Sequence, residues 1–125
     1  MSSSTGNPQV GNLADALREL VGQPLSSVEF VQDYVQLHFD GPTLTAYTRP
    51  TISVRSSTLA WCDSGYRDAL CEQIGSVVHR VKVQPEEVSL LFESGSGIEV
   101  SLRPDDYRGP EALQFWLKAG RTWVA

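Results

Sequence analysis

The two histidines, His38 and His79, are the residues best suited to general acid–base chemistry, because the imidazole pKa lies near neutral pH. His38 falls on the polar side of an alternating apolar–polar segment, and His79 stands beside Arg80 in another such segment. Neither belongs to a motif such as H-E-x-x-H, which places metal-binding imidazoles on one helix face. We therefore expect both to be solvated strand residues, and no catalytic residue is predicted.

Acidic side chains recur where turns and strand ends are expected, at Asp33, Asp40, Glu86, Glu87 and Glu93. Carboxylates are common there because they aid solubility and turn geometry, and this is the simpler interpretation. The alternative is an acidic patch, since Asp33 and Asp40 are equivalent to Glu86 and Glu93 in an internal repeat described below. A paired-carboxylate hydrolase would also need a cleft and a shifted pKa, and the sequence indicates neither.

Two Arg-Pro pairs, Arg49-Pro50 and Arg103-Pro104, also occupy equivalent positions of the repeat. Proline at such a position marks the end or the edge of a strand. We interpret each arginine first as a structural group that pairs with a carboxylate of the other repeat. The alternative is that Arg49 and Arg103 bind an anionic ligand in a cleft between the repeats.

Aromatic side chains complete the candidates. Tyr34 and Tyr47 fall on the predicted outer face of their strands, and Trp61 lies outside the repeats. Aromatic residues are enriched at interface hot spots but also fill cores, and for Trp61 both interpretations stay open. We expect Trp116 and Trp123 to pack against the domain. The candidate binding residues are therefore Asp33, Tyr34, His38, Asp40, Tyr47, Arg49, Trp61, Glu86, Glu87 and Arg103.

The two cysteines, Cys62 and Cys71, form no C-x-x-C motif and have no histidine or further cysteine beside them. We expect two buried free thiols rather than a redox pair or half of a metal site. No metal ligand and no cofactor is predicted, and the sequence leans away from an enzyme.

The composition is that of a globular domain, with 125 residues of which 41% are hydrophobic and 20% charged. Its formal net charge of −5 repels a phosphate backbone, which argues against nucleic-acid binding. No apolar stretch approaches the roughly 20 residues that span a bilayer, so no membrane association is expected. Residues 1–9 lack the apolar core of a secretory signal, which favours a disordered lead-in and a cytoplasmic location.

The chain contains an internal repeat with an offset of 53 residues, and one inserted residue in the second turn raises the offset to 54, at which the two Arg-Pro pairs align. Residues 15–22, DALRELVG, align with residues 68–75, DALCEQIG. The same offset aligns three apolar strand positions, which are Val35 with Val88, Leu37 with Leu90 and Phe39 with Phe92. Because the matches fall on apolar, glycine and helix positions, they indicate a shared fold.

Each repeat predicts one helix followed by three antiparallel strands. In the first repeat, Leu13, Ala16, Leu17 and Leu20 form one apolar helix face behind the N-cap Asn12. In the second, Asp63 or Ser64 caps the helix. Apolar and polar residues then alternate with the period of a strand in residues 28–31, 35–39, 44–48, 77–83, 88–92 and 98–102.

The predicted fold class is α+β, with two pseudo-symmetric helix–strand–strand–strand repeats packed into one antiparallel-sheet domain, because a meander with one apolar face must cover that face. A strand is also expected at 52–54, followed by a crossing at 59–61. The tail after Tyr107 fits a short helix at 111–117 or a hairpin, and we favour the hairpin. The predicted boundaries are a lead-in 1–11, repeat one 12–50, a connector 51–62, repeat two 63–104 and a C-terminal segment 105–125.

Three segments carry a resemblance: FVQDYVQL at 30–37, GYRDAL at 65–70 and SLRPDDYRGPEA at 101–112. They resemble a widespread family of small uncharacterised bacterial proteins that contain a domain of unknown function. The resemblance covers nearly the whole chain after the lead-in. It implies no activity, cofactor or catalytic residue.

Three functions fit these features. The first is a protein-binding module, because an acidic domain without a catalytic constellation carries exposed aromatic residues and antiparallel edges. Its partner would be another protein or a second copy of the chain, and one version is an immunity-type protein whose acidic face masks a basic toxin. The second is a small-molecule binder or enzyme with its site between the two repeats. The third is a structural homodimer subunit.

Overall fold

The computed structural model describes residues 8–32, 34–106, 111–117 and 121–125. Within these ranges, helices and antiparallel strands follow one another, which confirms the α+β class. The elements, with 3-10 helices labelled η, are α1 (Pro8–Leu17), η1 (Arg18–Leu20), β1 (Ser27–Val31), β2 (Tyr34–His38), β3 (Thr43–Ala46), β4 (Thr51–Val54), β5 (Ser57–Leu59), α2 (Tyr66–Cys71), β6 (Val78–Gln84), β7 (Glu87–Phe92), β8 (Gly97–Ser101), η2 (Pro104–Asp106), β9 (Leu113–Leu117) and β10 (Arg121–Val124).

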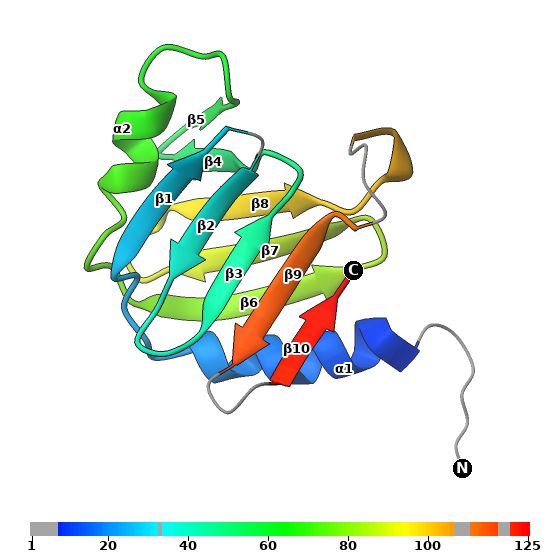
Figure 1. Cartoon of the computed structure of the whole chain (residues 1–125). Coiled ribbons are helices and arrows are strands. Elements are labelled where there is room, and N and C mark those ends of the chain that lie inside the picture. The colour runs from blue at the N-terminus through cyan, green and yellow to red at the C-terminus, as the bar shows by residue number, and fades with distance from the viewer. Residues whose placement is uncertain (1–7, 33, 107–110, 118–120) are drawn as a thin grey trace.

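The strands form two five-stranded antiparallel sheets that pack face to face (Figure 1). Sheet 1 has the order β1-β2-β3-β9-β10, and sheet 2 has the order β5-β4-β8-β7-β6. Each sheet therefore combines a three-stranded meander with a hairpin from elsewhere in the chain. The hairpin β4-β5, which follows the first meander in sequence, joins sheet 2, and the hairpin β9-β10, which follows the second meander, joins sheet 1.

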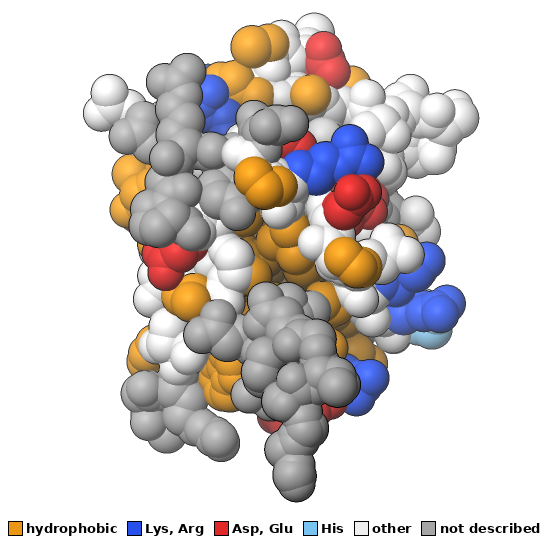
Figure 2. Space-filling view, turned by 90° about the vertical axis from the view of Figure 1, so that its right-hand side faces the viewer, with side chains coloured by type: hydrophobic (Ala, Val, Ile, Leu, Met, Phe, Trp, Pro, Cys, Tyr) orange, Lys and Arg blue, Asp and Glu red, His pale blue; other side chains and the backbone are white. Residues whose placement is uncertain are grey.

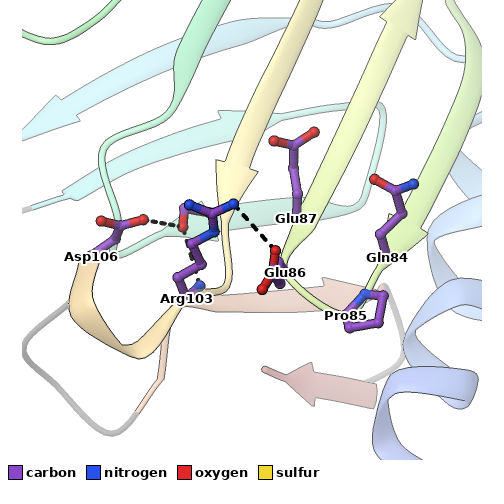
Figure 3. Close-up of a pocket in the computed structure, with 7 residues that line it drawn as sticks. Gln84, Pro85, Glu86, Glu87, Arg103 and Asp106 are labelled. Carbon is purple, nitrogen blue, oxygen red and sulfur yellow. Dashed lines mark hydrogen bonds and ion pairs between the residues drawn. The ribbon is translucent and has the colours of Figure 1, made fainter.

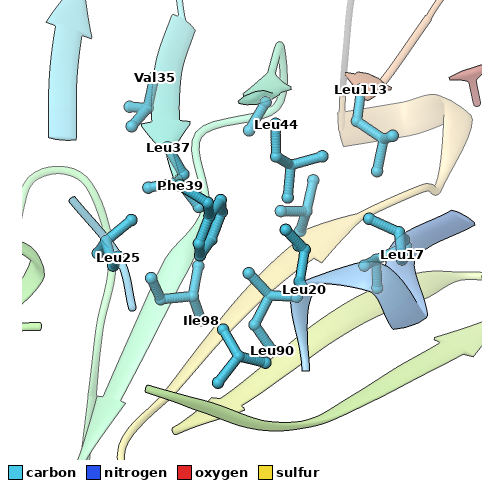
Figure 4. Packing of buried hydrophobic residues seen from close by; sticks show 14 of the residues in the cluster. Leu17, Leu20, Leu25, Val35, Leu37, Phe39, Leu44, Leu90, Ile98 and Leu113 are labelled. Carbon is cyan, nitrogen blue, oxygen red and sulfur yellow. The ribbon is translucent and has the colours of Figure 1, made fainter. Parts of the chain in front are cut away.

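The hydrophobic core lies between the two sheets, because alternate residues of the strands point into the same interior. Val35 and Leu37 of β2 are fully buried, as are Val88 and Leu90 of β7. Figure 4 shows Leu37 and Phe39 on one side of this interior and Leu90 and Ile98 on the other. Viewed from the right of Figure 1, hydrophobic side chains gather in the middle of the molecule (Figure 2).

The first helix begins at Pro8, which lies before the predicted N-cap Asn12. The expectation of a disordered lead-in up to residue 11 is therefore wrong for its last part. Proline suits the first turn of a helix because its φ angle is already fixed and no amide donor is needed there. The apolar face is as predicted, since Leu13 and Leu17 are fully buried, and the helix contacts β6, β9 and β10.

The second helix is capped differently from the prediction. Its N-cap is Gly65, whose φ of +85° lies in the left-handed region that favours glycine, and no side chain caps the helix. The carboxylate of Asp63 instead accepts a hydrogen bond from the N–H of Ala60 at 2.8 Å. Tyr66 opens the helix and is 1% exposed, and the helix contacts β1 and β4.

Backbone hydrogen bonds join the segment after the first helix to the segment after the second, in two reciprocal pairs. The pairs are Gly22 N–H to Val78 O (2.8 Å) with Gly75 N–H to Leu25 O (2.7 Å), and Leu25 N–H to Ser76 O (3.0 Å) with Val78 N–H to Gln23 O (2.9 Å). The two members of each pair are related by the 53-residue offset. Gly22 and Gly75 also share left-handed φ angles of +88° and +93°.

The segments outside the repeats are both hairpins. The C-terminal hairpin is confirmed, because β9 pairs with β10 and residues 113–117 form a strand rather than a helix. A crossing was expected at 59–61, but residue 59 is the last residue of β5, which pairs with β4, and this strand was not predicted. Arg55 in the turn between β4 and β5 has a φ of +55°, which lets so short a turn reverse the chain.

The two cysteines are free, as predicted, but both are exposed, so the prediction of buried thiols is wrong. Helix geometry gives the reason for Cys71. The buried face of α2 consists of Tyr66, Ala69 and Leu70, and the next residue along a helix turns away from such a face by about 100°.

Candidate functional site

The outer face of sheet 1 gathers aromatic, amide and hydroxyl side chains. Its side chains alternate with buried residues such as Leu37 and Leu44 and therefore lie on the outer side of the sheet, where neighbouring side chains leave Thr45 only 7% exposed. The strand register places them in rows that cross the sheet. We call this surface the sheet-1 face and define it as Glu29, Tyr34, Gln36, His38, Thr43, Thr45, Tyr47, Gln114 and Trp116.

Aromatic rings and amides form one connected layer on this face. The Tyr34 and Tyr47 rings meet edge to face with centroids 5.6 Å apart. The Tyr47 hydroxyl donates to Oε1 of Gln114 at 2.9 Å, and Nε2 of Gln36 donates to the Thr45 hydroxyl at 3.1 Å. Burial raises the pKa of Tyr47 above its usual value, and the Glu111 carboxylate and Tyr34 add to the rise. These contacts order the side chains across the sheet.

His38 lies on the sheet-1 face with both ring nitrogens engaged. Nδ1 lies 3.2 Å from the Thr43 hydroxyl, and Nε2 lies 3.1 Å from Oε1 of Glu29. An imidazole held between a hydroxyl and a carboxylate on a flat surface orders the face. That His38 has no catalytic role stays a prediction.

Trp116 is 40% exposed, so the expectation that it packs into the domain is wrong. Its neighbours in β9 are Phe115, which is fully buried, and Leu117, which packs against the core. Alternation along the strand therefore turns the indole outward. Thr43 of β3 lies opposite it in the register, which brings it onto the sheet-1 face.

The outer face of sheet 2 differs because it carries charged groups. One row runs through Lys82, Ser89, Glu99 and Thr51. The half-buried carboxylate of Glu99 accepts hydrogen bonds from Thr51 at 2.9 Å and from Ser53 at 3.2 Å. Burial raises its pKa above the usual value; the hydrogen bonds partly offset this rise, and the charge of Glu87 adds to it.

A third surface gathers cationic and aromatic groups beside α2. The guanidinium carbon of Arg49 lies 4.1 Å from the centroid of the Trp61 ring, and that of Arg67 lies 4.9 Å from the same centroid. The Phe30 ring lies 5.7 Å from Arg67. Arg49 was expected to pair with a carboxylate of the other repeat, but its Nη2 donates to the carbonyl of Gln32 at 3.1 Å.

Tyr66 supports this cluster from within the domain. Its ring meets Trp61 edge to face at 5.8 Å, and its hydroxyl donates to the carbonyl of Pro50. Burial raises the pKa of Tyr66 to about 12, although the charges of Arg49 and Arg67 oppose that rise. The same buried phenol therefore fixes the indole and the backbone next to Arg49.

An open pocket of about 650 Å³ lies at the β6–β7 turn. Figure 3 shows Arg103 between Asp106 and Glu86 at its rim. Nη2 of Arg103 donates to Oε1 of Glu86 at 3.2 Å, so this arginine pairs with a carboxylate of its own repeat, and the expectation of a partner in the other repeat is wrong. Glu87 accepts a hydrogen bond from the Ser89 hydroxyl at 3.0 Å.

The predicted candidates that the structure describes thus fall into three groups, with Asp40 apart from all of them. Tyr34, His38 and Tyr47 come together on the sheet-1 face. Arg49 meets Trp61 beside α2. Glu86, Glu87 and Arg103 lie at the β6–β7 pocket, and Asp40 is exposed after β2. Asp33 lies outside the described residues. The acidic candidates therefore do not define the two aromatic surfaces.

The candidate list lacks several residues of these surfaces, among them Gln36, Gln114, Trp116 and Arg67. Gln36 and Gln114 sit at polar positions of alternating strands, and Trp116 follows the same alternation in β9. That period-two pattern was available as a signal once residues 113–117 were taken as a strand. Arg67 gave no such signal, because its approach to Trp61 depends on how α2 docks on the sheets.

Among the described residues, His, Cys, Asp and Glu side chains form no group of three or more that could hold a metal ion. None of the described helices is long and apolar enough to cross a membrane. No protein-family model, curated protein or solved structure matches the chain. The family resemblance stays a prediction, and function has to be argued from the surfaces themselves.

Proposed function

We propose that this protein is a protein-binding module and that a protein partner docks on the sheet-1 face. The observation that carries the proposal is the make-up of that face. It presents Tyr34, Tyr47 and Trp116 among amides and hydroxyls, and its two ionisable side chains, Glu29 and His38, contact each other at 3.1 Å. Protein interfaces are enriched in aromatic residues and depleted of charge at their centre.

The chemistry of the face defines the partner. Gln36, Gln114 and Thr43 offer hydrogen-bonding groups without net charge, so a partner with a flat, uncharged and hydrogen-bonding surface fits best. A highly charged ligand would find little compensation there. The chain's formal net charge of −5 speeds the approach of a basic partner without forming the contact itself. An immunity role and a cytoplasmic location fit this module and stay predictions.

Residues 12–50 and 63–104 are, in this proposal, two copies of one unit. The reciprocal hydrogen bonds of Gly22 and Gly75 support it, as does the placement of each following hairpin in the opposite sheet. A ligand site between the copies finds less support. The two pockets near the candidate residues are each lined within a single stretch, one by residues 84–106 and one by residues 61–68.

Capture of a protein does not by itself test the proposal; the test is the affinity of each captured partner for the protein and its variants. Immobilised protein collects binding proteins from an extract of its own cells, and each is then purified and titrated by calorimetry. Trp116→Ala should weaken Kd about 30-fold, because a central interface tryptophan contributes about 2 kcal/mol or more. Amide hydrogen exchange in the complex should show protection of β2, β3 and β9.

The matched control is Lys82→Ala on the outer face of sheet 2, which should change Kd less than twofold. Equal losses in both variants would contradict the assignment of the face, and so would protection confined to β7 and β8. Sedimentation provides a second criterion. A dimer that Trp116→Ala dissociates would replace the foreign partner by a second copy of the chain.

A further inference from the structure

We infer that Arg49, Trp61 and Arg67 form a second binding site, which takes carboxylate side chains of an acidic peptide segment. Two guanidinium groups lie 4.1 and 4.9 Å from the centroid of one indole ring. The inference goes beyond the proposed function, because it rests on contacts beside α2 and holds whether or not a partner docks on the sheet-1 face.

Stacking on an aromatic ring leaves the N–H edges of a guanidinium free. Cation–π contact occupies the flat side of the group, while its donors lie in the plane and match the two oxygens of a carboxylate. Among the described residues, Arg49 donates to the Gln32 carbonyl at 3.1 Å, and Arg67 has its two ring contacts and no hydrogen bond. Both groups are thus oriented yet largely unused as donors.

Two arginines of the described chain form ion pairs, and the arginines of this cluster do not. Arg18 pairs with Asp15 at 2.9 Å, and Arg103 pairs with Glu86 at 3.2 Å. In the same described residues, neither Arg49 nor Arg67 has a carboxylate oxygen within 4.0 Å. The guanidinium carbons lie 4.1 and 4.9 Å from the same ring centroid, so the two positive charges repel each other, and a bound carboxylate relieves that repulsion.

A rigid support holds the arginines in place. Tyr66 is 1% exposed, packs against Trp61 at 5.8 Å and donates its hydroxyl proton to the carbonyl of Pro50. Pro50 follows Arg49, and Arg67 follows Tyr66. One buried side chain therefore anchors the backbone on both sides of the indole, and little entropy is lost when a ligand binds.

The surroundings select among anions. A pocket of about 270 Å³ opens beside Trp61, and its lining includes Arg67, Asp63 and Asp68. Asp63 already accepts a hydrogen bond from Ala60 N–H at 2.8 Å. These two carboxylates repel a phosphate dianion more than they repel a singly charged carboxylate, so the site favours Asp or Glu side chains of a peptide.

The test follows the Nε–Hε resonances of the arginine side chains by NMR in the full-length protein. The probe is acetyl-Glu-Asp-Glu-amide, and the matched control peptide is acetyl-Gln-Asn-Gln-amide at the same ionic strength. We expect saturable shifts at Arg49 and Arg67 with the acidic peptide and none with its neutral counterpart. Arg103, already paired with Glu86, should not move.

The variants Arg49→Gln and Arg67→Gln should each weaken the acidic peptide about tenfold, because a charge-assisted hydrogen bond is lost. Arg103→Gln should leave its affinity unchanged, and backbone amide spectra check that each variant is folded. Non-saturable shifts, or equal losses in Arg103→Gln, would overturn the site. Tighter binding of inorganic phosphate than of the peptide at pH 7 would overturn its assignment to carboxylates.

Discussion

The peptide N–H of Gly22 donates a hydrogen bond to the carbonyl oxygen of Val78 at 2.8 Å, so the end of the first helical segment is fixed to the first residue of β6. Gly22 reaches that geometry with a φ of +88°, and no atom lies within 4 Å of where a Cβ would be. The demand on this position is therefore one of backbone conformation rather than of space.

Gly22→Ala should lower the free energy of unfolding by about 1–2 kcal/mol, because an L-residue is strained at this φ. Gly75→Ala should cost a similar amount, since its φ is +93° and its surroundings are equally open. Urea denaturation measures both. Gly22→Asn is the matched control and should lose less, because asparagine tolerates the left-handed region. Equal losses for Ala and Asn would contradict the conformational explanation.

Tyr66→Phe should destabilise the protein by about 1–3 kcal/mol, since the buried carbonyl of Pro50 loses its donor. Tyr47→Phe removes a hydroxyl from the half-exposed sheet-1 face, where water replaces Gln114, and should cost less. Thermal and urea unfolding of the two variants provide the comparison. The order of the two losses is the result that matters, and a larger loss for Tyr47→Phe would refute the account.

Glu99→Gln should stabilise the protein at pH 7 and lose this advantage as the pH falls. The pKa of Glu99 is raised in the folded state, so between the unfolded pKa and the folded pKa the folded protein holds a proton that the unfolded chain has released. The contribution of this group to stability is therefore complete below the unfolded pKa and is lost as the pH rises through the folded pKa. Unfolding free energies of both proteins between pH 3 and pH 8 test the sign.

Fragments 1–62 and 63–125 should assemble into the native fold when they are expressed together. Each fragment alone has a meander whose apolar face lacks its covering sheet, and a hairpin whose partner strand is absent. We expect each to be largely unfolded by circular dichroism, and an equimolar mixture to recover the native spectrum. A fragment that folds alone as a monomer would disprove this dependence.

Local patterns in the sequence were sufficient to predict most strands. Alternation at Val35, Leu37 and Phe39 identified both the strand and its buried face, because the period of two is a property of each strand by itself. The helix face at Leu13 and Leu17 followed from the same reasoning with a period of 3.6. The first helix was predicted to begin too late, because Pro8 already belongs to its first turn, where the fixed φ of proline suits a helix.

Long-range pairing was not accessible in this way. Nothing local to β3 indicates that Leu44 lies opposite Phe115 of β9, because sheet partners are chosen by the whole fold. Part of the candidate site was not predicted for the same reason. Tyr34 and Tyr47 were predicted on one face, whereas Arg67 reaches Trp61 only through the docking of α2, and the cysteines were placed inside by residue type alone.

The exchange of hairpins between the sheets also bears on synthesis of the chain. When a ribosome has completed the first meander, β3 presents an edge of unpaired amide and carbonyl groups. Leu113 of β9, which lies opposite Ala46 in the register, has not yet been made. Sheet 2 can be completed earlier, because all five of its strands are made before β9 and β10. The nascent protein thus carries one open sheet until translation is nearly finished, and a chaperone that shields strand edges would act in that interval.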